Sequence, residues 1–247
     1  MGKNILNVCN LRKIYHTKDD EILAVENFSF SLHKGEIIAI VGPSGCGKST
    51  ILNMIGNLIP KSSGKIEFNE DKNISYMLQE DALFSFRTVL KNCLLGLEIK
   101  NIDTNENREY VNQLIKRYGL EEFKNSYPAN LSGGMRQRVA LIRTLATHPN
   151  LILLDEPFSA LDFQSRLLLT DDVYKIIKEE NISAIMITHN IEEAASMANR
   201  VIVLSDRPSI IKNIYKTNFN ELPSINRKNK NFNNLCTQIW KDIDIHV

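Results

Sequence analysis

The sequence predicts an α/β fold, because three patterns occur together along its 247 residues. Four short apolar runs, at 37–41, 151–154, 184–187 and 201–204, are rich in Ile, Leu and Val. Such runs are typical of strands buried on both faces of a parallel sheet. Helical patterns lie between these runs, as an α/β protein requires. Residues 27–32 instead alternate polar and apolar side chains, which predicts a half-buried antiparallel strand.

The other segments are assigned from the same kinds of pattern. Residues 80–150 contain no convincing strand and several helical stretches, so we expect a helical insertion there. Residues 216–234 are rich in Asn and Lys and are expected to form a surface linker, followed by an amphipathic helix over 233–243. We therefore expect one domain of three parts: a core with its antiparallel β part (4–79 and 143–215), a helical subdomain (80–142), and a linker with a short helix (216–247).

Composition excludes several classes of protein. The formal net charge is +1, so no overall field favours nucleic acid, and we expect no nucleic-acid partner. The cysteines are scattered and form no CxxC pair, which argues against a zinc site or a redox motif: Cys9, Cys46, Cys93 and Cys236. The longest apolar runs are far shorter than the ~18–20 residues that cross a bilayer, and the first residues do not resemble a signal peptide. Any membrane association is therefore expected to go through a partner.

A phosphate-binding loop is the first chemical motif. It fits the pattern GxxxxGK[ST] and lies between a predicted strand (36–41) and a predicted helix (48–57), as this motif requires. Its glycines allow a tight turn with N–H groups directed at phosphate oxygens, and the helix N-terminus adds partial positive charge. Lys48 can reach the β- and γ-phosphates, and the Ser49 hydroxyl can bind Mg²⁺. The loop consists of Gly42, Pro43, Ser44, Gly45, Cys46, Gly47, Lys48, Ser49 and Thr50.

Polar residues also follow three predicted strands. Asp155 and Glu156 end the run 151–154, where Asp155 suits Mg²⁺ and Glu156 can accept a proton from an attacking water. Gln79 follows the strand 74–78, and His189 follows the strand 184–188. Taken singly, Gln79 and His189 would be assigned to ordinary structural positions, and an acidic pair after a strand is a weak signal. Together with the phosphate loop, the acidic pair indicates a site for nucleotide hydrolysis.

A second glycine-rich motif opens a helix. Residues 131–137 read Leu-Ser-Gly-Gly-Met-Arg-Gln, and apolar residues recur beyond them at helical spacing. Ser132, Gly133 and Gly134 leave backbone N–H groups free for an anion, and Gln137 follows one turn later.

With these motifs in this order, the sequence resembles the ABC ATPase family over nearly its whole length. The resemblance implies a P-loop NTPase (RecA-like) core with an antiparallel β-subdomain and a helical subdomain. It implies that Tyr15 stacks on adenine, that Gln79 senses Mg²⁺ and that Asp155 is the Mg²⁺-associated carboxylate. It further implies that Glu156 is the catalytic base and that His189 contacts the γ-phosphate. Residues 159–162, ending in Asp162, resemble the loop that connects two active sites.

The resemblance also implies the assembly. Residues 131–137 resemble the family's signature motif, and the helix that they open is called the signature helix below. ATP and Mg²⁺ would bind between two copies in a head-to-tail homodimer, with each signature helix capping the γ-phosphate of the other copy's ATP. Hydrolysis would open the dimer and drive an integral-membrane permease, with a solute-binding protein as an indirect partner. The expected location is the cytoplasmic face of the membrane.

Local features resemble the nitrate/sulfonate/taurine importer group, which implies a small organic or inorganic anion as cargo. These features are Gly133-Gly134-Met135, the segment 80–90, and the sequence Leu-Ser-Asp-Arg-Pro at 204–208. The chain departs from that group at Ser85-Phe86, where Pro-Trp is usual, and at Asn190, where Asp is usual. Importers of riboflavin or thiamine precursors share much of the pattern and remain an alternative. Two further alternatives are a non-transport ABC ATPase acting on nucleic acid and a regulator that binds nucleotide without turnover.

Overall fold

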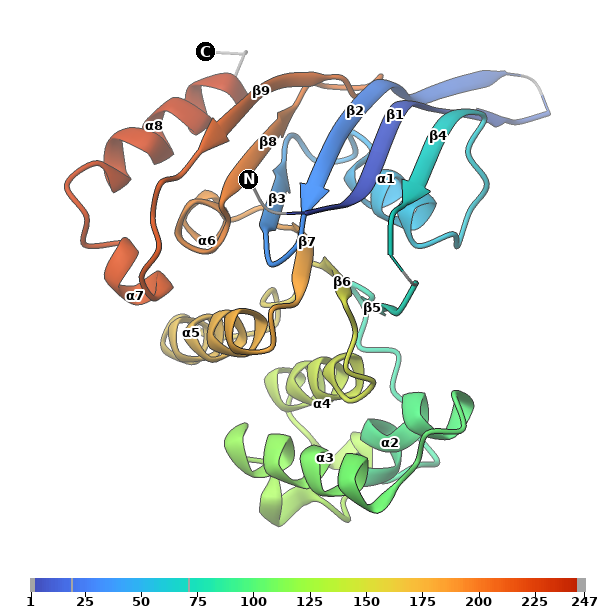
Figure 1. The fold of residues 1–247 in the computed structure, drawn as a ribbon, viewed down its shortest axis with the longest axis vertical. Helices are drawn as coiled ribbons and strands as arrows, with labels where there is room; N and C mark the ends of the chain where they lie inside the picture. Colours follow the sequence, from blue (N-terminus) through green and yellow to red (C-terminus); the bar gives the residue numbers. More distant parts are fainter. Residues whose placement is uncertain (1–2, 19, 71, 244–247) are drawn as a thin grey trace.

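The computed structural model describes residues 3–18, 20–70 and 72–243, and its main sheet has six strands (Figure 1). Five strands are parallel, and the sixth, β9, pairs antiparallel with β8 at one edge. In spatial order they are β5 (Ile74–Met77), β6 (Leu151–Asp155), β7 (Ser183–Ile187), β3 (Ile37–Val41), β8 (Arg200–Leu204) and β9 (Ile211–Lys216). The predicted α/β class is confirmed.

Alternate residues of the central strand β3 enter two different cores. Ile37, Ala39 and Val41 join the core that includes the helical part, whereas Ile38 and Ile40 join the core beneath the antiparallel sheet. All five are at most 1% exposed. Burial on both faces explains why this strand reads as a continuous apolar run.

A second sheet of three antiparallel strands covers one side of the main sheet (Figure 1). Its order is β2 (Glu21–His33), β1 (Asn4–His16) and β4 (Ser63–Phe68). It shares a hydrophobic core with α1 (Lys48–Ile55). The predicted strand at 27–32 is the second half of β2, where Phe28, Phe30 and Leu32 are buried.

The helical part lies at the far end of the molecule from the antiparallel sheet (Figure 1). It consists of α2 (Val89–Ile99), α3 (Asn105–Arg117), two 3₁₀ turns (Glu121–Phe123 and Pro128–Asn130) and α4 (Gly133–Leu145). Each of the helices α2 and α3 is capped at its N-terminus by its own threonine, whose side chain accepts a hydrogen bond from a first-turn N–H group. The division into subdomains stays a prediction, and α4 continues past the expected boundary at residue 142.

On the other side of the main sheet lie α5 (Phe163–Glu179) and α6 (Ile191–Met197), followed along the chain by α7 (Pro223–Asn226) and α8 (Phe232–Ile243). Residues 216–234 are therefore more ordered than the expected surface linker. Asn226, 3% exposed, donates hydrogen bonds of 2.8 Å to the carbonyl oxygens of Ser196 and Glu221. The expectation of a surface linker rested on the polar composition of this segment, which does not show that a polar residue such as Asn226 is buried by hydrogen bonds. Residues 244–247 of the expected tail lie outside the described residues.

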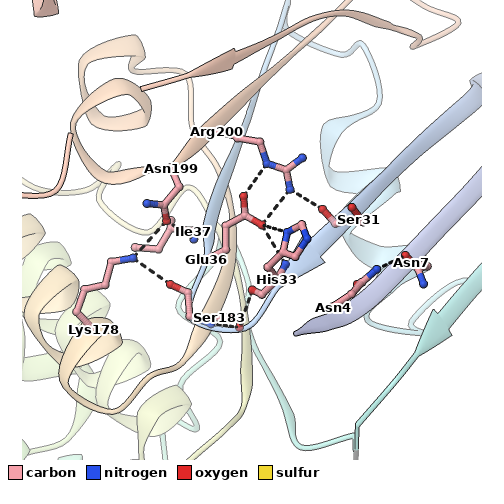
Figure 2. Close-up of polar contacts among 11 residues, drawn as sticks. Asn4, Asn7, Ser31, His33, Glu36, Ile37, Lys178, Ser183, Asn199 and Arg200 are labelled. Atoms are coloured by element: carbon pink, nitrogen blue, oxygen red, sulfur yellow. Dashed lines mark hydrogen bonds and ion pairs between the residues drawn. The ribbon is translucent and has the colours of Figure 1, made fainter. Parts of the chain in front are cut away.

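A half-buried ion pair lies at the amino ends of the parallel strands, and its arginine also bonds to the antiparallel sheet (Figure 2). Arg200 donates to both carboxylate oxygens of Glu36 at 2.6 and 2.9 Å and to the carbonyl of Ser31 at 2.5 Å. Burial raises the pKa of Glu36, but hydrogen bonds from Arg200 and from the backbone N–H of His33 outweigh it and leave this pKa below its ordinary value. The opposite, carboxyl ends of the strands carry the motifs described next.

None of the helices within the described part of the chain has the length and apolar character needed to cross a bilayer.

Candidate functional site

The phosphate loop connects β3 to α1 at the carboxyl end of the sheet. Gly47 precedes α1 with φ of 120°, a conformation that side chains rarely allow. A Cβ atom there would lie 2.6 Å from the Ser209 hydroxyl oxygen, so glycine is also required for space. Because Gly47 has no side chain to cap α1, the first-turn N–H groups remain available to an anion.

Lys48 is folded against its own loop. Its ammonium group donates to the carbonyl oxygens of Gly42 at 2.9 Å and Pro43 at 2.7 Å, and the residue is 5% exposed. These contacts hold the positive charge at the base of the loop, beside the space where the phosphates of a nucleotide would lie.

A cavity of about 400 Å³ opens beside the loop. It brings together most of the residues that the motifs predict, from five separate segments of the chain. Tyr15 lines it from β1, with its hydroxyl oxygen 3.3 Å from that of Thr50 and the Lys13 ammonium 4.8 Å from its ring centroid. The predicted residues that line the cavity are Tyr15, Ser44, Gly45, Gly47, Lys48, Ser49, Thr50, Gln79, Glu156 and His189.

Asp155 and Ser49 form a candidate Mg²⁺ site. Asp155 is 4% exposed, and its burial raises the pKa of the carboxyl group, while a hydrogen bond with Ser49 lowers it. One buried carboxylate oxygen, Oδ1, has no hydrogen-bond partner among the described residues. A buried, unpartnered carboxylate oxygen beside a hydroxyl fits the oxygen-ligand preference of Mg²⁺, so these residues fit the expected ion.

Glu156 and His189 are in direct contact. Oε1 of Glu156 lies 2.6 Å from Nε2 of His189, and their side chains are 13% and 50% exposed. Glu156 has φ of 51°, in the left-handed region, and its N–H group donates to the Ile187 carbonyl at 2.9 Å. A non-glycine residue in this conformation is uncommon, and such residues cluster at functional sites. The site thus places a carboxylate base against an imidazole, facing the phosphate loop.

The signature helix lies outside this cavity. Ser132 caps α4 by accepting from the Met135 N–H group at 3.2 Å, and a Cβ atom on Gly134 would lie 2.9 Å from a Leu161 methyl group. Gln137 is buried and donates to the Glu156 carbonyl at 3.2 Å. Gln79, Gly133 and Gln137 line a second cavity of about 400 Å³ next to the first, so Gln79 lies between the two.

Asp162 is also not among the residues that line the first cavity. It caps α5, where Oδ1 accepts from the Ser165 N–H group at 3.0 Å, and hydrogen bonds with Ser165 lower the pKa of its carboxyl group. Asn190 caps α6 in the same way, and its side-chain oxygen accepts a hydrogen bond from the Glu193 N–H group at 3.0 Å. An asparagine at this position therefore keeps the helix cap that an aspartate would supply.

Sequence reasoning missed three residues that line the first cavity: Ile22, Ala24 and Arg207. Ile22 and Ala24 lie on β2 opposite the loop, and no motif marks them. Arg207 follows β8, and it donates to the Gly45 carbonyl at 2.7 Å. Its segment, 204–208, carries part of the importer resemblance, and its place in a loop at the carboxyl end of a parallel strand, where ligands bind in α/β sheets, is the signal that could have marked it.

Comparisons with known proteins agree with these features. The family model described as ABC transporter matches residues 25–159. The ATP-binding protein YtlC of Bacillus subtilis, described as an uncharacterized ABC transporter protein, is 40% identical over 98% of this chain and 96% of its own length. The taurine import ATP-binding protein TauB of Pelagibacter ubique is 38% identical over 85% of this chain and 82% of its own. Relatives named for taurine, nitrate and aliphatic sulfonate import are 34–38% identical, in agreement with the predicted resemblance.

A solved structure has the same architecture. The dimeric ATP-binding cassette MJ0796, in a post-hydrolysis state bound to ADP and Pi, superposes with a TM-score of 0.78 at 29% identity. The match covers 87% of this chain and 100% of that one.

Proposed function

Because this chain belongs to the ABC transporter family, we propose that it binds and hydrolyses ATP as the motor subunit of an ABC importer. The observation that carries the proposal is the shared cavity. A phosphate loop, a buried lysine, and the contacting pair Glu156 and His189 line one space at the carboxyl end of the sheet.

In this proposal each residue has a distinct task. The loop N–H groups and Lys48 hold the phosphates, and Tyr15 stacks on the adenine. Ser49, Gln79 and Asp155 would hold Mg²⁺, which when bound neutralises phosphate charge. Glu156 accepts the proton of the attacking water, and His189 positions Glu156 and contacts the γ-phosphate. Catalysis then depends mainly on positioning and charge stabilisation.

We further propose that two copies act head to tail. The signature residues Ser132, Gly133 and Gly134, together with Asp162, lie outside the cavity that the phosphate loop lines. A second copy, rotated so that its signature helix faces this cavity, would complete the site. The dimeric state of the MJ0796 cassette supports this arrangement.

The proposed partner is an integral-membrane permease. Phe86 is 74% exposed, and its ring centroid lies 5.4 Å from that of Phe84. An exposed aromatic pair in the segment after Gln79 suits the docking of an apolar permease helix. The names of the taurine, nitrate and sulfonate relatives favour a small organic or inorganic anion as cargo. Riboflavin or thiamine-precursor cargo is the alternative.

The test is affinity purification of the tagged chain from detergent-solubilised membranes, with the untagged chain as the control. We expect a polytopic permease and a solute-binding protein, and ligand screening of the latter would decide between the cargo classes. Recovery of only soluble proteins or nucleic acid would contradict the transport role.

A further inference from the structure

The segment between β8 and β9 is fastened to both the phosphate loop and β2. Ser209 is fully buried, and its hydroxyl donates to the carbonyl oxygens of Cys46 and Ala24. Backbone hydrogen bonds of 3.0 Å join Ser209 to Ala24 and to Glu26. The segment is therefore held in a fixed position along the outer edge of the loop.

Arg207 projects from this segment to the cavity. One of its terminal nitrogens, Nη2, donates to the Gly45 carbonyl, and the side chain lines the cavity wall. No acidic side chain in the described ranges forms an ion pair with Arg207. The guanidinium has five N–H groups, so one bond to the loop leaves the others available.

The charged side chains that line the cavity indicate which ligand this guanidinium would bind. Lys48 and Arg207 are the lysine and arginine side chains that line it, while Glu156 contributes a carboxylate. Lys48 already donates to two loop carbonyls. A planar guanidinium presents a fork of donors that matches phosphate oxygens, and it carries its charge at all physiological pH values.

We propose that Arg207 is a further nucleotide-binding residue, which holds the phosphate chain of the bound nucleotide while its contact with Gly45 fixes its direction. This inference rests on the proposed nucleotide site and gives a binding role to a residue of the segment 204–208, which the importer resemblance marks without assigning it a function. Arg207 binds the nucleotide and takes no part in proton transfer.

The test measures equilibrium binding of ADP, of the non-hydrolysable analogue adenylyl-imidodiphosphate, and of adenosine. The variants are Arg207→Gln, which keeps an amide donor for the Gly45 carbonyl but removes the charge, and Arg207→Lys, which keeps the charge. Arg108→Gln is the matched control, because that arginine is 53% exposed on α3, outside the cavity. Ser209→Ala tests the effect of a weakened loop contact without any change in charge.

We expect Arg207→Gln to weaken binding of ADP and of the analogue about tenfold, in line with the strength of hydrogen bonds to charged groups. Adenosine binding should be unchanged, Arg207→Lys should recover part of the loss, and the salt dependence of ADP binding should become shallower. Unchanged ADP binding in Arg207→Gln would overturn the proposal. So would an equal loss for adenosine, or the same profile in Ser209→Ala, since either would mean that Arg207 only braces the loop. Wild-type protein that binds no ADP would instead contradict the proposed function itself.

Discussion

Oε1 of Glu156, at the end of β6, lies 2.6 Å from Nε2 of His189, which follows β7. Two neighbouring parallel strands thus end in one contacting carboxylate–imidazole pair, which lines the cavity beside the phosphate loop. Because Glu156 is mostly buried and His189 is half exposed, the imidazole covers the carboxylate on its solvent side.

The first prediction concerns His189. In His189→Ala the Glu156 carboxylate loses the 2.6 Å partner that positions it, so we expect kcat for ATP hydrolysis to fall by about 100-fold, at the lower end of the effect of losing the proton-transfer group itself. The KM for ATP should change much less than kcat. Steady-state kinetics check this, with His148→Ala as the control, since His148 lies outside the cavity. An unchanged kcat would remove His189 from the site.

Asp155 should show opposite effects on stability and on ligand binding. Burial raises the pKa of this carboxyl group, which means that the folded protein bears a cost for keeping it ionised. Asp155→Asn should therefore be as stable as the wild type, or up to about 1 kcal/mol more stable, in the absence of nucleotide. With Mg²⁺ and ATP, the wild type should gain about 2.7 kcal/mol at a ligand concentration of 100 Kd, and the variant should lose most of this gain.

Thermal unfolding with and without Mg²⁺-ATP measures both effects. Asp172→Asn is the control, because the ion pair of Asp172 with Arg117 is long, at 4.0 Å, and Asp172 does not line the cavity. A full Mg²⁺-ATP stabilisation in Asp155→Asn would contradict the assignment of the ion to this carboxylate.

The ion pair between Glu36 and Arg200 predicts a pH-dependent contribution to stability. The pKa of Glu36 is lower than its ordinary value of 4.5, so its contribution is fully present above that pH and disappears as the pH falls through the lower, folded-state pKa. Glu36→Gln should cost about 1.5–3 kcal/mol at pH 7, because the half-buried Arg200 would lose the charged partner of its hydrogen bonds. The difference between variant and wild type should shrink below pH 4.5.

Urea denaturation at pH 7 and pH 3.5 is the appropriate measurement. Glu67→Gln, an exposed carboxylate on β4, should change stability by less than about 0.5 kcal/mol. A difference for Glu36→Gln that is the same at both pH values would contradict this account.

Phe86 should matter for assembly and not for hydrolysis. Removing its ring in Phe86→Ala deletes an exposed apolar contact and leaves the cavity intact, so co-purification of the permease should fall several-fold while basal ATPase persists. Ile99→Ala is the matched control, because Ile99 is 71% exposed at the end of α2 in the same helical part. Unchanged recovery of the permease would exclude Phe86 from the interface.

The sequence predicted those parts of the fold in which consecutive residues are all buried or follow a motif of fixed spacing. The strand β3 is apolar throughout because both of its faces are buried, and its loop carries a motif with fixed spacing. The edge strand β9 was missed because three of its six residues are Lys or Asn and its burial is partial. The helix α7 was missed because Asn226 is buried by hydrogen bonds rather than by apolar contact.

The candidate site shows the same distinction. Residues in local motifs could be predicted to lie together, since parallel strands bring their carboxyl ends to one edge. The contribution of Arg207 depends on a contact with Gly45 across 162 residues of sequence, and no local pattern can indicate such a contact.

The central claim is that this chain hydrolyses ATP with Glu156 as the base, and Glu156→Gln tests it most directly. The measurement is ATP hydrolysis by the purified wild type and variant, with the oligomeric state followed by size-exclusion chromatography in Mg²⁺-ATP. We expect hydrolysis in the variant to fall at least about 100-fold, with ATP still bound and the dimer accumulating. Glu192→Gln, an exposed carboxylate on α6, should behave as the wild type. Wild-type turnover in Glu156→Gln would contradict the account.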